Sequence, residues 1–503
     1  MTTKQRKQKN TTAGRVLRIL GECALMVFVL VAFLCFFGAM CYRGIYGDTG
    51  FDSVLYTLFG GLGGMQPGLL WKFMAGAVLP SVLLTVAMGL LIHDPKRGKR
   101  MPKPKTLRIV SAVLSLGLIV HAAFNVGLVG YVWDQLHLSG LYETQYKDPN
   151  KVEITFPEEK RNLIYIYLES METSFLSTAD GGAMAVDLIP ELHQLAKDNL
   201  NFSHNTNIGG MVEVPGATWT AGAMVAHSAG VPMVAPSDLE DTFNGYGKDG
   251  VFLPGLTTLY NILHDEGYYQ ALMVGSDANF GGRKTYFETH GVDKVYDLYT
   301  ARVDGIIPGN YFVWWGMEDL HLYEYAKQEL TEMAAMDQPF AFTMLTVDTH
   351  HVGGYKCSLC GSDYAENYDN VYACASKQIL SFIQWIQEQD FYENTTIIIT
   401  GDHFSMDSGY FKRVAGEGYV RHGYNCFINA AAEPAGSTEN RVFTPLDMFP
   451  TTLAAMGCQI DEDQLGLGVN LFSGKPTLAE QMGYEAFCEE LKQRSEYYEN
   501  HFH

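Results

Sequence analysis

Three long apolar stretches near the start of the sequence set the strongest limit on how this 503-residue chain can fold. Crossing the hydrocarbon core of a bilayer takes ~20 mostly apolar residues, and each stretch reaches that length. A cleavable signal peptide is the alternative for the first stretch, but its apolar region is too long and no small-residue cleavage site follows it. Lys72 and Pro80 interrupt the second stretch, for which a buried core helix is the alternative. The stretches cover residues 16–42, 70–93 and 107–133.

We therefore predict that residues 1–133 form a membrane anchor with about three transmembrane helices. The Gly-rich segment 55–69 is too short to span alone, and we expect it at the membrane interface. Basic residues precede the first stretch and fill the loop between the second and third, which places both regions in the cytoplasm. Residues 134–503 then lie outside the cytoplasm, in a multi-pass protein of the cell membrane. The basic residues are Lys4, Arg6, Lys7, Lys9, Arg15, Arg18, Lys96, Arg97, Lys99, Arg100, Lys103, Lys105 and Arg108.

The rest of the chain is strongly acidic. Of the 35 Lys and Arg and 56 Asp and Glu in the whole chain, 20 and 52 fall in residues 134–503, which gives this region a formal charge of −32. Nucleic acid is excluded as a partner, because phosphate backbones bind to basic patches. An anionic substrate would need a local positive centre, which a bound metal ion can provide.

Cysteines suggest a local cross-link outside the membrane. Three of the nine fall in the first apolar stretch, and Cys357, Cys360 and Cys374 lie close together in sequence. A C-x-x-C pair can be half of a zinc site, but no second pair follows. In an oxidising exterior we expect a disulfide within this group, with free thiols or a metal site as alternatives. The sequence does not specify the pairing.

After a polar connector at 134–160, expected at the surface, short apolar runs alternate with amphipathic helical segments. Strands without polar alternation, each followed by a helix, predict an α/β sheet covered on both faces. We assign residues 161–475 to this domain and 476–503 to a C-terminal helical tail. The predicted strands are 162–169, 269–275, 339–347, 395–400 and 426–430. The predicted helices are 189–199, 255–268, 316–335, 370–389 and 447–457.

Three of these strands end in residues that can bind a metal. The first stops at Glu169, the fourth is followed by Gly401-Asp402-His403, and the third by a segment that contains His350. Functional groups of such sheets gather at the carboxyl ends of the strands, so these side chains are expected to meet. A turn or a solvent-facing carboxylate would explain each one singly. A mixed carboxylate–imidazole set suits one divalent ion, with Mn²⁺ expected and Zn²⁺ or Mg²⁺ as alternatives.

These motifs resemble the alkaline phosphatase/sulfatase superfamily, in the branch of lipoteichoic acid synthases and phosphoglycerol transferases. The resemblance covers about residues 160–470. NLIYIYLESMETSF resembles the family's opening strand, whose metal-binding Glu falls on Glu169. ENTTIIITGDHFSM resembles the late strand, whose Asp-His ligand pair falls on Asp402 and His403. The resemblance implies a central mixed, mostly parallel sheet with helices on both faces.

The resemblance also implies a threonine nucleophile that contacts the metal at the start of a helix. Two threonines compete in EVPGATWTAGAMVAHSAGVPM (213–233), namely Thr218 and Thr220. Thr220 fits better, because it opens an apolar helix and precedes a small residue. The amino end of a helix favours an attacking oxyanion and the phosphate that it meets. The alternative is that either threonine only caps the helix.

Three more residues are expected to contact the substrate. His350, in TVDTHH, falls on the family's phosphate-contacting histidine and is expected to assist proton transfers. Arg283, in NFGGR, falls on an arginine that grips phosphoglycerol, and its guanidinium matches phosphate oxygens bidentately. His422, in VRHGYNC, is a weaker candidate for the same pocket, since an isolated histidine is more often structural.

We expect metal-dependent transfer of phosphoglycerol from phosphatidylglycerol through a phospho-threonine intermediate. The acceptor would be the hydroxyl of a glycolipid, a teichoic acid or another glycan. A phosphoethanolamine transferase, a phosphodiesterase and a catalytically silent binding protein are the alternatives. Two departures matter: the segment GATWTAG lacks the polar run of lipoteichoic acid synthases, and three spans are visible where those enzymes are expected to have five. A C-x-P-x-R segment is absent from the sequence, which argues against sulfatase activity.

Overall fold

The structure is a computed structural model that describes residues 3–47, 50–59, 67–93, 102–234 and 250–503. The chain divides into two compact units. The first comprises Met1–Asp48 and Met65–Val132, and the second comprises Thr49–Gly64 and Trp133–His503. Helix α2 (Phe51–Phe59) therefore groups with the larger unit, although it lies within the predicted anchor 1–133. Much of the basic loop (94–101) and part of the Gly-rich segment (60–66) lie outside the described residues.

The first unit contains three helical stretches long and apolar enough to cross a membrane: Val16–Tyr46, Leu70–His93 and Pro104–Asn125. They belong to α1 (Thr3–Tyr46), to α3 (Pro67–Phe73) with α4 (Leu79–His93), and to α5 (Pro104–Asn125). Between α3 and α4 a π-helical turn covers Met74–Val78, directly before Pro80. Proline lacks the N–H that an α-helix would use there, which accounts for the wider turn.

A carboxylate links the helices of this unit. Glu22 of α1 accepts hydrogen bonds from Arg18 Nε at 3.1 Å, from His93 Nε2 at 2.8 Å and from Arg108. Polar groups in a membrane region pair with one another, because unpaired charges are costly in hydrocarbon. The cluster therefore holds α1, α4 and α5 together.

The second unit is built on one large sheet with the strand order β3-β8-β7-β2-β6-β4-β5. Strands β5, β4, β6, β2 and β7 run parallel to their neighbours, whereas β8 is antiparallel to β7 and to β3. The strands are β2 (Asn162–Leu168), β3 (Gly210–Met211), β4 (Tyr269–Val274), β5 (Lys294–Tyr296), β6 (Phe340–Leu345), β7 (Thr395–Gly401) and β8 (Gly423–Ile428). The mixed, mostly parallel sheet expected from the sequence is confirmed.

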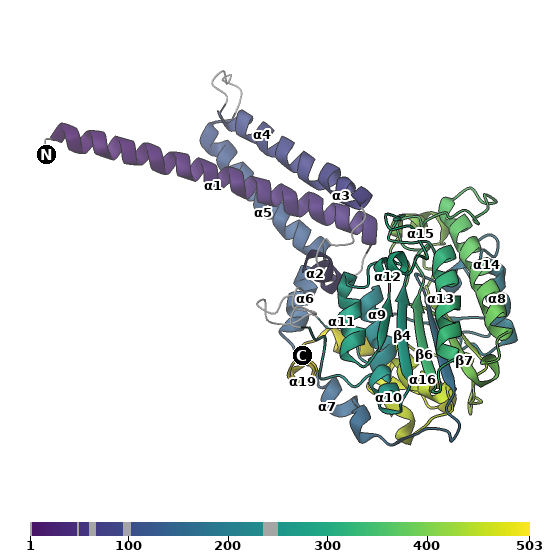
Figure 1. Ribbon diagram of the computed structural model, residues 1–503. Helices are drawn as coiled ribbons and strands as arrows, with labels where there is room; N and C mark the ends of the chain where they lie inside the picture. Colours follow the sequence, from purple (N-terminus) through teal and green to yellow (C-terminus); the bar gives the residue numbers. More distant parts are fainter. Residues whose placement is uncertain (1–2, 48–49, 60–66, 94–101, 235–249) are drawn as a thin grey trace. The chain divides into compact units, whose positions relative to one another are not determined.

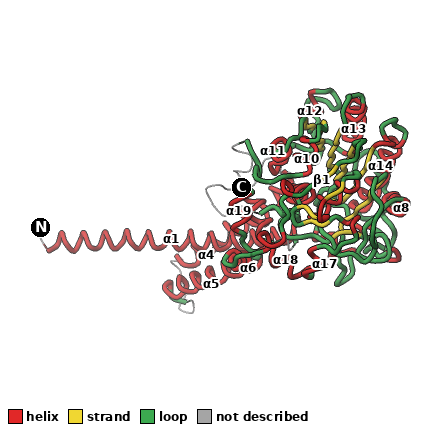
Figure 2. The backbone as a smooth tube through the Cα atoms, turned by 90° about the horizontal axis from the view of Figure 1, so that it is seen from below, coloured by secondary structure: helices red, strands yellow, loops and turns green. Residues whose placement is uncertain are grey.

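Helices cover both faces of this sheet (Figure 1). Strand β2 shows why: Leu163, Tyr165 and Tyr167 point into one hydrophobic core, and the intervening Ile164 and Ile166 point into the other. One core is formed with α9 (Thr220–Ala229), α10 (Leu259–Asp265), α11 (Arg283–Thr289) and α16 (Met448–Ala455). The other is formed with α8 (Pro190–Asp198), α12 (Leu298–Val303), α13 (Asp319–Ala334), α14 (Asn367–Gln387) and α15 (Ser408–Val414). Figure 2 shows the strands enclosed between these helices.

The predicted polar connector is not a surface segment throughout. Leu141 and Tyr142, in α7 (Leu141–Gln145), are only 3% and 4% exposed. The Tyr142 ring lies 5.6 Å from that of Tyr498 and 6.0 Å from that of Phe502, measured between centroids. Aromatic residues at the end of the chain therefore bury the connector. The C-terminal segment is helical, as α17 (Leu478–Met482), α18 (Tyr484–Lys492) and α19 (Glu496–His501).

Smaller elements complete the description. Two short antiparallel pairs join distant segments, β1 (Ile154–Thr155) with β9 (Gln459–Ile460) and β10 (Gln464–Leu465) with β11 (Gly468–Val469). Helix α6 covers Leu128–Gln135. Strands β3 and β5 were not expected from the sequence, since two or three residues are too few to show a periodic pattern.

Candidate metal centre

The candidate site lies where three parallel strands end. Strand β2 is the central one, with β7 on one side and β6 on the other. The register pairs Leu168 of β2 with Gly401 of β7, so the residues that follow them, Glu169 and Asp402, are adjacent. Strands β2, β6 and β7 are buried almost throughout and contain no charged residue or histidine, so the first such side chains of each segment appear at this edge. The fold therefore brings these groups together at the carboxyl ends of the strands, where the sequence analysis expected them to meet.

Glu169, Asp402 and His403 form a compact buried group. Each offers one ligand atom, and these atoms lie within 4.8 Å of one another. His403 Nε2 is 3.6 Å from Glu169 Oε1 and 3.4 Å from Asp402 Oδ2. The three residues are between 1% and 4% exposed. Two carboxylates and one imidazole converge here in an arrangement that can hold one cation.

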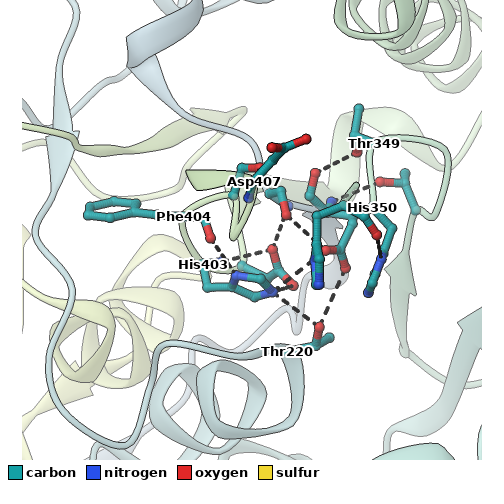
Figure 3. Close-up of polar contacts among 12 residues, drawn as sticks. Thr220, Thr349, His350, His403, Phe404 and Asp407 are labelled. Atoms are coloured by element: carbon teal, nitrogen blue, oxygen red, sulfur yellow. Dashed lines mark hydrogen bonds and ion pairs between the residues drawn. The ribbon is translucent and has the colours of Figure 1, made fainter. Parts of the chain in front are cut away.

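Neighbouring groups orient these ligands. The Ser170 hydroxyl donates to Glu169 Oε1 at 2.9 Å, and the Ser170 backbone N–H donates to Asp402 Oδ1 at 2.8 Å. The backbone N–H of His403 donates to the same Oδ1 at 2.7 Å. His403 Nδ1 lies 2.8 Å from the carbonyl oxygen of Phe404 (Figure 3), so Nδ1 carries a proton and Nε2, which faces the carboxylates, is the ring atom available to a metal ion.

Thr220 extends this group. Its Oγ1 lies 3.3 Å from His403 Nε2 and 3.4 Å from Glu169 Oε2 (Figure 3). It is the first residue of α9, and the capping position before it belongs to Trp219, so Thr220 does not act as the helix cap. The competing Thr218 has its Oγ1 3.3 Å from Ser53 Oγ instead. Of the two threonines, Thr220 is the one beside the metal-binding groups.

His350 lies close to the same centre (Figure 3). Its Nδ1 is 2.7 Å from the carbonyl oxygen of His351, which leaves Nε2 as a hydrogen-bond acceptor. Burial, together with the charges of His403 and Arg283, lowers the pKa of His350 to about 3, so the ring is neutral. Its ring centroid is 4.2 Å from that of Trp315, which the sequence analysis did not identify.

Arg283 is buried beside the centre at the start of α11. Its guanidinium donates to Ser276 Oγ at 3.0 Å and to the carbonyl oxygens of Asp277 at 2.7 Å and Phe280 at 3.0 Å. These bonds fix its orientation, and its positive charge acts on Glu169 by lowering the pKa of that carboxyl group.

His422 stands apart from the other predicted residues. Its ring stacks on that of His204 with centroids 3.3 Å apart, and burial followed by the charge of His204 lowers its pKa to about 3. Within the described residues, the side chain of His422 forms no hydrogen bond or ion pair with Glu169, Asp402 or His403. His204 has no sequence motif that would have identified it.

Glu213 is a further acidic group that sequence reasoning missed. It accepts a hydrogen bond from the backbone N–H of Phe404, and its charge raises the pKa of His403. Burial raises the pKa of Glu213 itself to about 7. The available sequence signal was that Glu213 is the first residue of the segment 213–233, which contains Thr220.

Comparison with known proteins agrees with this arrangement. A family model described as Sulfatase matches residues 161–458, more than half of the chain. The chain belongs to the sulfatase family. The superfamily that the strand-end motifs resemble is therefore confirmed. The match includes every residue of the metal centre.

Among curated proteins, the chain is similar to phosphoglycerol transferase I of Escherichia fergusonii, with 27% identity over 439 residues. This covers 85% of the present chain and 54% of the relative, so the chain spans about half the length of the curated relatives that it matches. Among solved structures, it is similar to the lipoteichoic acid synthase LtaP from Listeria monocytogenes (18% identity, 64% and 79% of the two chains, TM-score 0.48). It is also similar to the lipooligosaccharide phosphoethanolamine transferase A of Neisseria meningitidis (12% identity, 87% and 84%, TM-score 0.49).

The electrostatics of this sulfatase-family site fit a cation. Asp402 Oδ2 is buried and, within the described residues, has no hydrogen-bond partner. Burial and the charge of Asp402 raise the pKa of Glu169 to about 8. Burial alone would lower the pKa of His403, but Asp402 and Glu169 outweigh it and raise that pKa to about 8. Without a cation these groups can share protons, and a divalent ion can replace the protons and satisfy the unpartnered oxygen.

Proposed function

We propose that this sulfatase-family protein is a metal-dependent phosphotransferase that moves a phosphoglycerol group from phosphatidylglycerol to a hydroxyl acceptor. The observation that carries the proposal is the position of the Thr220 hydroxyl, 3.3 Å from His403 Nε2 and 3.4 Å from Glu169 Oε2. A hydroxyl that both contacts a metal centre and opens a helix is placed for attack on phosphorus. The name of the curated relatives supports phosphoglycerol as the transferred group.

Glu169, Asp402, His403 and Thr220 would hold one divalent ion, for which we propose Mn²⁺, with Zn²⁺ and Mg²⁺ as alternatives. When bound, such an ion polarises phosphoryl oxygens and lowers the pKa of a coordinated hydroxyl. Thr220 Oγ attacks the phosphorus of the donor, the P–O bond to diacylglycerol breaks, and diacylglycerol takes up a proton as it leaves. The product is glycerophosphate esterified to Thr220.

The second step regenerates the enzyme. The acceptor hydroxyl attacks the same phosphorus and gives up its proton, the bond to Thr220 Oγ breaks, and Thr220 Oγ takes up a proton to restore its hydroxyl. The neutral His350 presents Nε2 as an acceptor for the hydroxyl proton. Arg283, already held in place by three hydrogen bonds, offers its charge to the phosphate oxygens. His422 stays a weaker proposed contact in the same pocket.

The apolar helices support a membrane location for this chemistry. A lipid donor lies in a bilayer leaflet, and a domain joined to helices that can span the bilayer meets it without leaving the membrane. We propose that the sulfatase-family domain faces the outside of the cell membrane, that the acceptor is a glycolipid or a glycan polymer, and that nucleic acid is not a partner.

The test uses the full chain in detergent with phosphatidylglycerol that carries a labelled glycerol headgroup. Thr220→Ala is expected to abolish headgroup release while binding the divalent ion with near wild-type affinity. Thr218→Val is the matched control, because Thr218 contacts Ser53 and should keep its activity. Wild-type headgroup release by Thr220→Ala would refute the assignment of the nucleophile.

Product analysis by mass spectrometry separates the related activities. Faster turnover of labelled phosphatidylethanolamine would indicate a phosphoethanolamine transferase. Free glycerophosphate in the presence of a glycolipid acceptor would indicate a phosphodiesterase. Absence of both turnover and bound divalent ion would indicate a silent binding protein. Phosphoglycerol attached to the acceptor is the result that we expect.

A further inference from the structure

A second cluster of potential ligands lies in the same unit, away from the residues assigned to catalysis. The disulfide expected from the sequence is not formed: Cys357, Cys360 and Cys374 are free thiols. Their sulfur atoms nevertheless lie within 4.8 Å of one another, and Cys357 and Cys374 are each 5% exposed. A disulfide would join only two of these three buried thiols and leave the third unpaired beside the bond. A single disulfide therefore does not explain why all three sulfur atoms face one another.

The spacing of the sulfur atoms matches a metal site. Cys357 Sγ is 3.6 Å from Cys360 Sγ and 3.8 Å from Cys374 Sγ. Tetrahedral coordination at a Zn–S distance of ~2.3 Å places neighbouring sulfur atoms ~3.8 Å apart. Both measured separations are close to the ~3.8 Å edge of a zinc–thiolate tetrahedron.

The backbone around the first cysteine is arranged for a thiolate. Residues 357–361 read Cys-Ser-Leu-Cys-Gly, and the backbone N–H groups of Leu359 and Cys360 lie near the sulfur of Cys357, where they favour its ionised form. The N–H of Cys360 also donates to the carbonyl oxygen of Cys357 at 3.2 Å, which closes a tight turn. Donors aimed at sulfur stabilise its ionised, metal-binding form.

Gln378 supplies an independent sign of a missing ligand. Its side chain is 8% exposed, its Nε2 lies 3.5 Å from Cys374 Sγ and 3.9 Å from Cys357 Sγ, and its Oε1 has no partner within the described residues. The two ends of an amide can be exchanged by rotating the group. The exchange would place Oε1 toward the sulfur atoms, and a tetrahedral site with one oxygen ligand has O···S edges of ~3.6 Å.

We propose that Cys357, Cys360 and Cys374 bind one thiophilic divalent cation, Zn²⁺ in the first place, with Gln378 Oε1 as the fourth ligand. All four positions of a closed structural zinc site are then filled by protein atoms. The proposal is independent of the proposed transfer reaction, because none of these residues belongs to the catalytic centre.

The site has a consequence for the loop that carries His350. Residues 346–366 join β6 to α14 without a helix or strand, and they contain His350, Cys357 and Cys360. Cys374 and Gln378 lie on α14 itself. A bound cation would therefore attach this long loop to the helix that follows it, where it supports the position of His350. Loops of this length without secondary structure are uncommon in compact domains and are often functional.

The first experiment needs no substitution. The full chain is purified in detergent under reducing conditions, loaded with Zn²⁺ and freed of excess metal, and its zinc content is measured. Two equivalents are expected, of which Asp402→Asn removes one and Cys374→Ser removes the other. Cys426→Ala is the matched control, because Cys426 is buried alone and donates to the carbonyl oxygen of Leu195. It should retain both equivalents.

Two further measurements identify the ligands. Co²⁺ in place of Zn²⁺ should give a sulfur-to-cobalt charge-transfer band in wild-type protein and in Asp402→Asn, and not in Cys374→Ser. Gln378→Leu should weaken cobalt affinity ~10–100-fold without removing the band, as loss of one of four ligands or of a supporting contact does. Circular dichroism checks that each variant is folded.

Peptide mapping of the unreduced wild-type protein, together with thiol alkylation, can contradict the proposed cation site. A disulfide between any two of Cys357, Cys360 and Cys374, with no cation bound, would overturn the proposal. Rapid alkylation of all three thiols in the presence of saturating Zn²⁺ would overturn it as well. Slow alkylation that becomes fast after chelation is the result that supports it. Because none of these readouts uses turnover, the proposed transfer activity can fail while this site is upheld, or the reverse.

Discussion

Ser170 offers a sharp test of how the metal centre is held. It is fully buried and has a positive φ of 55°, a conformation that turns its hydroxyl toward Glu169 and its backbone N–H toward Asp402. Ser170→Ala removes only the hydroxyl, because alanine keeps both the N–H and a Cβ and therefore adds no backbone strain. The substitution should leave Asp402 oriented and free Glu169 Oε1 of its 2.9 Å hydrogen bond.

The size of the effect follows from the chemistry of that bond. A hydrogen bond to a charged group contributes ~1.5–3 kcal/mol, which corresponds to ~10–150-fold in an equilibrium constant. Loss of a partner that orients a metal ligand lowers metal affinity by ~10–100-fold. The range calculated from the hydrogen bond and the range for such partners therefore agree. We expect Ser170→Ala to weaken binding of the divalent ion by ~10–100-fold, measured by titration calorimetry on the full chain at constant pH.

Ser174→Ala is the matched control. Ser174 is also fully buried, and its hydroxyl donates at 2.8 Å to a carboxylate, that of Glu172, which does not belong to the metal centre. Both variants should lose similar stability, but only Ser170→Ala should lose metal affinity. Equal metal affinity in the two variants would refute the inference that Ser170 positions Glu169.

Three other predictions follow from particular contacts. Because Glu169 and His403 both have a pKa raised to about 8, a metal ion must displace up to two protons below that pH. Apparent metal affinity should rise by up to ~100-fold per pH unit from 6 to 8 and then level off, and a flat profile would contradict this. Arg421→Ala leaves Glu172 buried without its ion pair and should lower the free energy of unfolding by ~3–5 kcal/mol in urea denaturation, whereas no loss would contradict the pairing. Gly401→Ala would place a Cβ 1.9 Å from a backbone carbonyl oxygen, so it should lower both the Tm and metal affinity, and an unchanged Tm would contradict the close approach.

The sequence allowed the architecture to be predicted because the strands of this sheet are buried on both faces. Strand β2 has no polar alternation, since its two sides enter two different cores, and such runs are recognisable without any structure. The position of Glu169, Asp402 and His403 followed from the same reasoning, because a charged residue or histidine that follows a buried, uncharged strand must emerge at the sheet edge. The direction of β8 did not follow, since apolar runs carry no information on whether neighbours are parallel.

The residues that sequence reasoning missed are joined to the site by contacts across the chain. Glu213 reaches the backbone of Phe404, 191 residues away, and Ser170 joins carboxylates that are 233 residues apart in sequence. Neither contact has a periodicity or a local motif. The buried connector was missed for a related reason, because Tyr142 lies in a polar segment and is covered by aromatic residues from the far end of the chain.

The placement of charge explains why a metal centre suits this fold. Residues 134–503 carry a strong negative charge, which repels an anionic lipid headgroup, and Glu213 adds a further acidic group beside Asp402 and His403. Among the described residues, Arg283 is the cation whose charge acts on Glu169, and its hydrogen bonds hold it in position. One positive side chain cannot balance several buried carboxylates. A divalent ion would balance them and would also attract the phosphate, so binding of the ion should precede binding of the donor. Donor affinity measured in Asp402→Asn should therefore fall together with metal content.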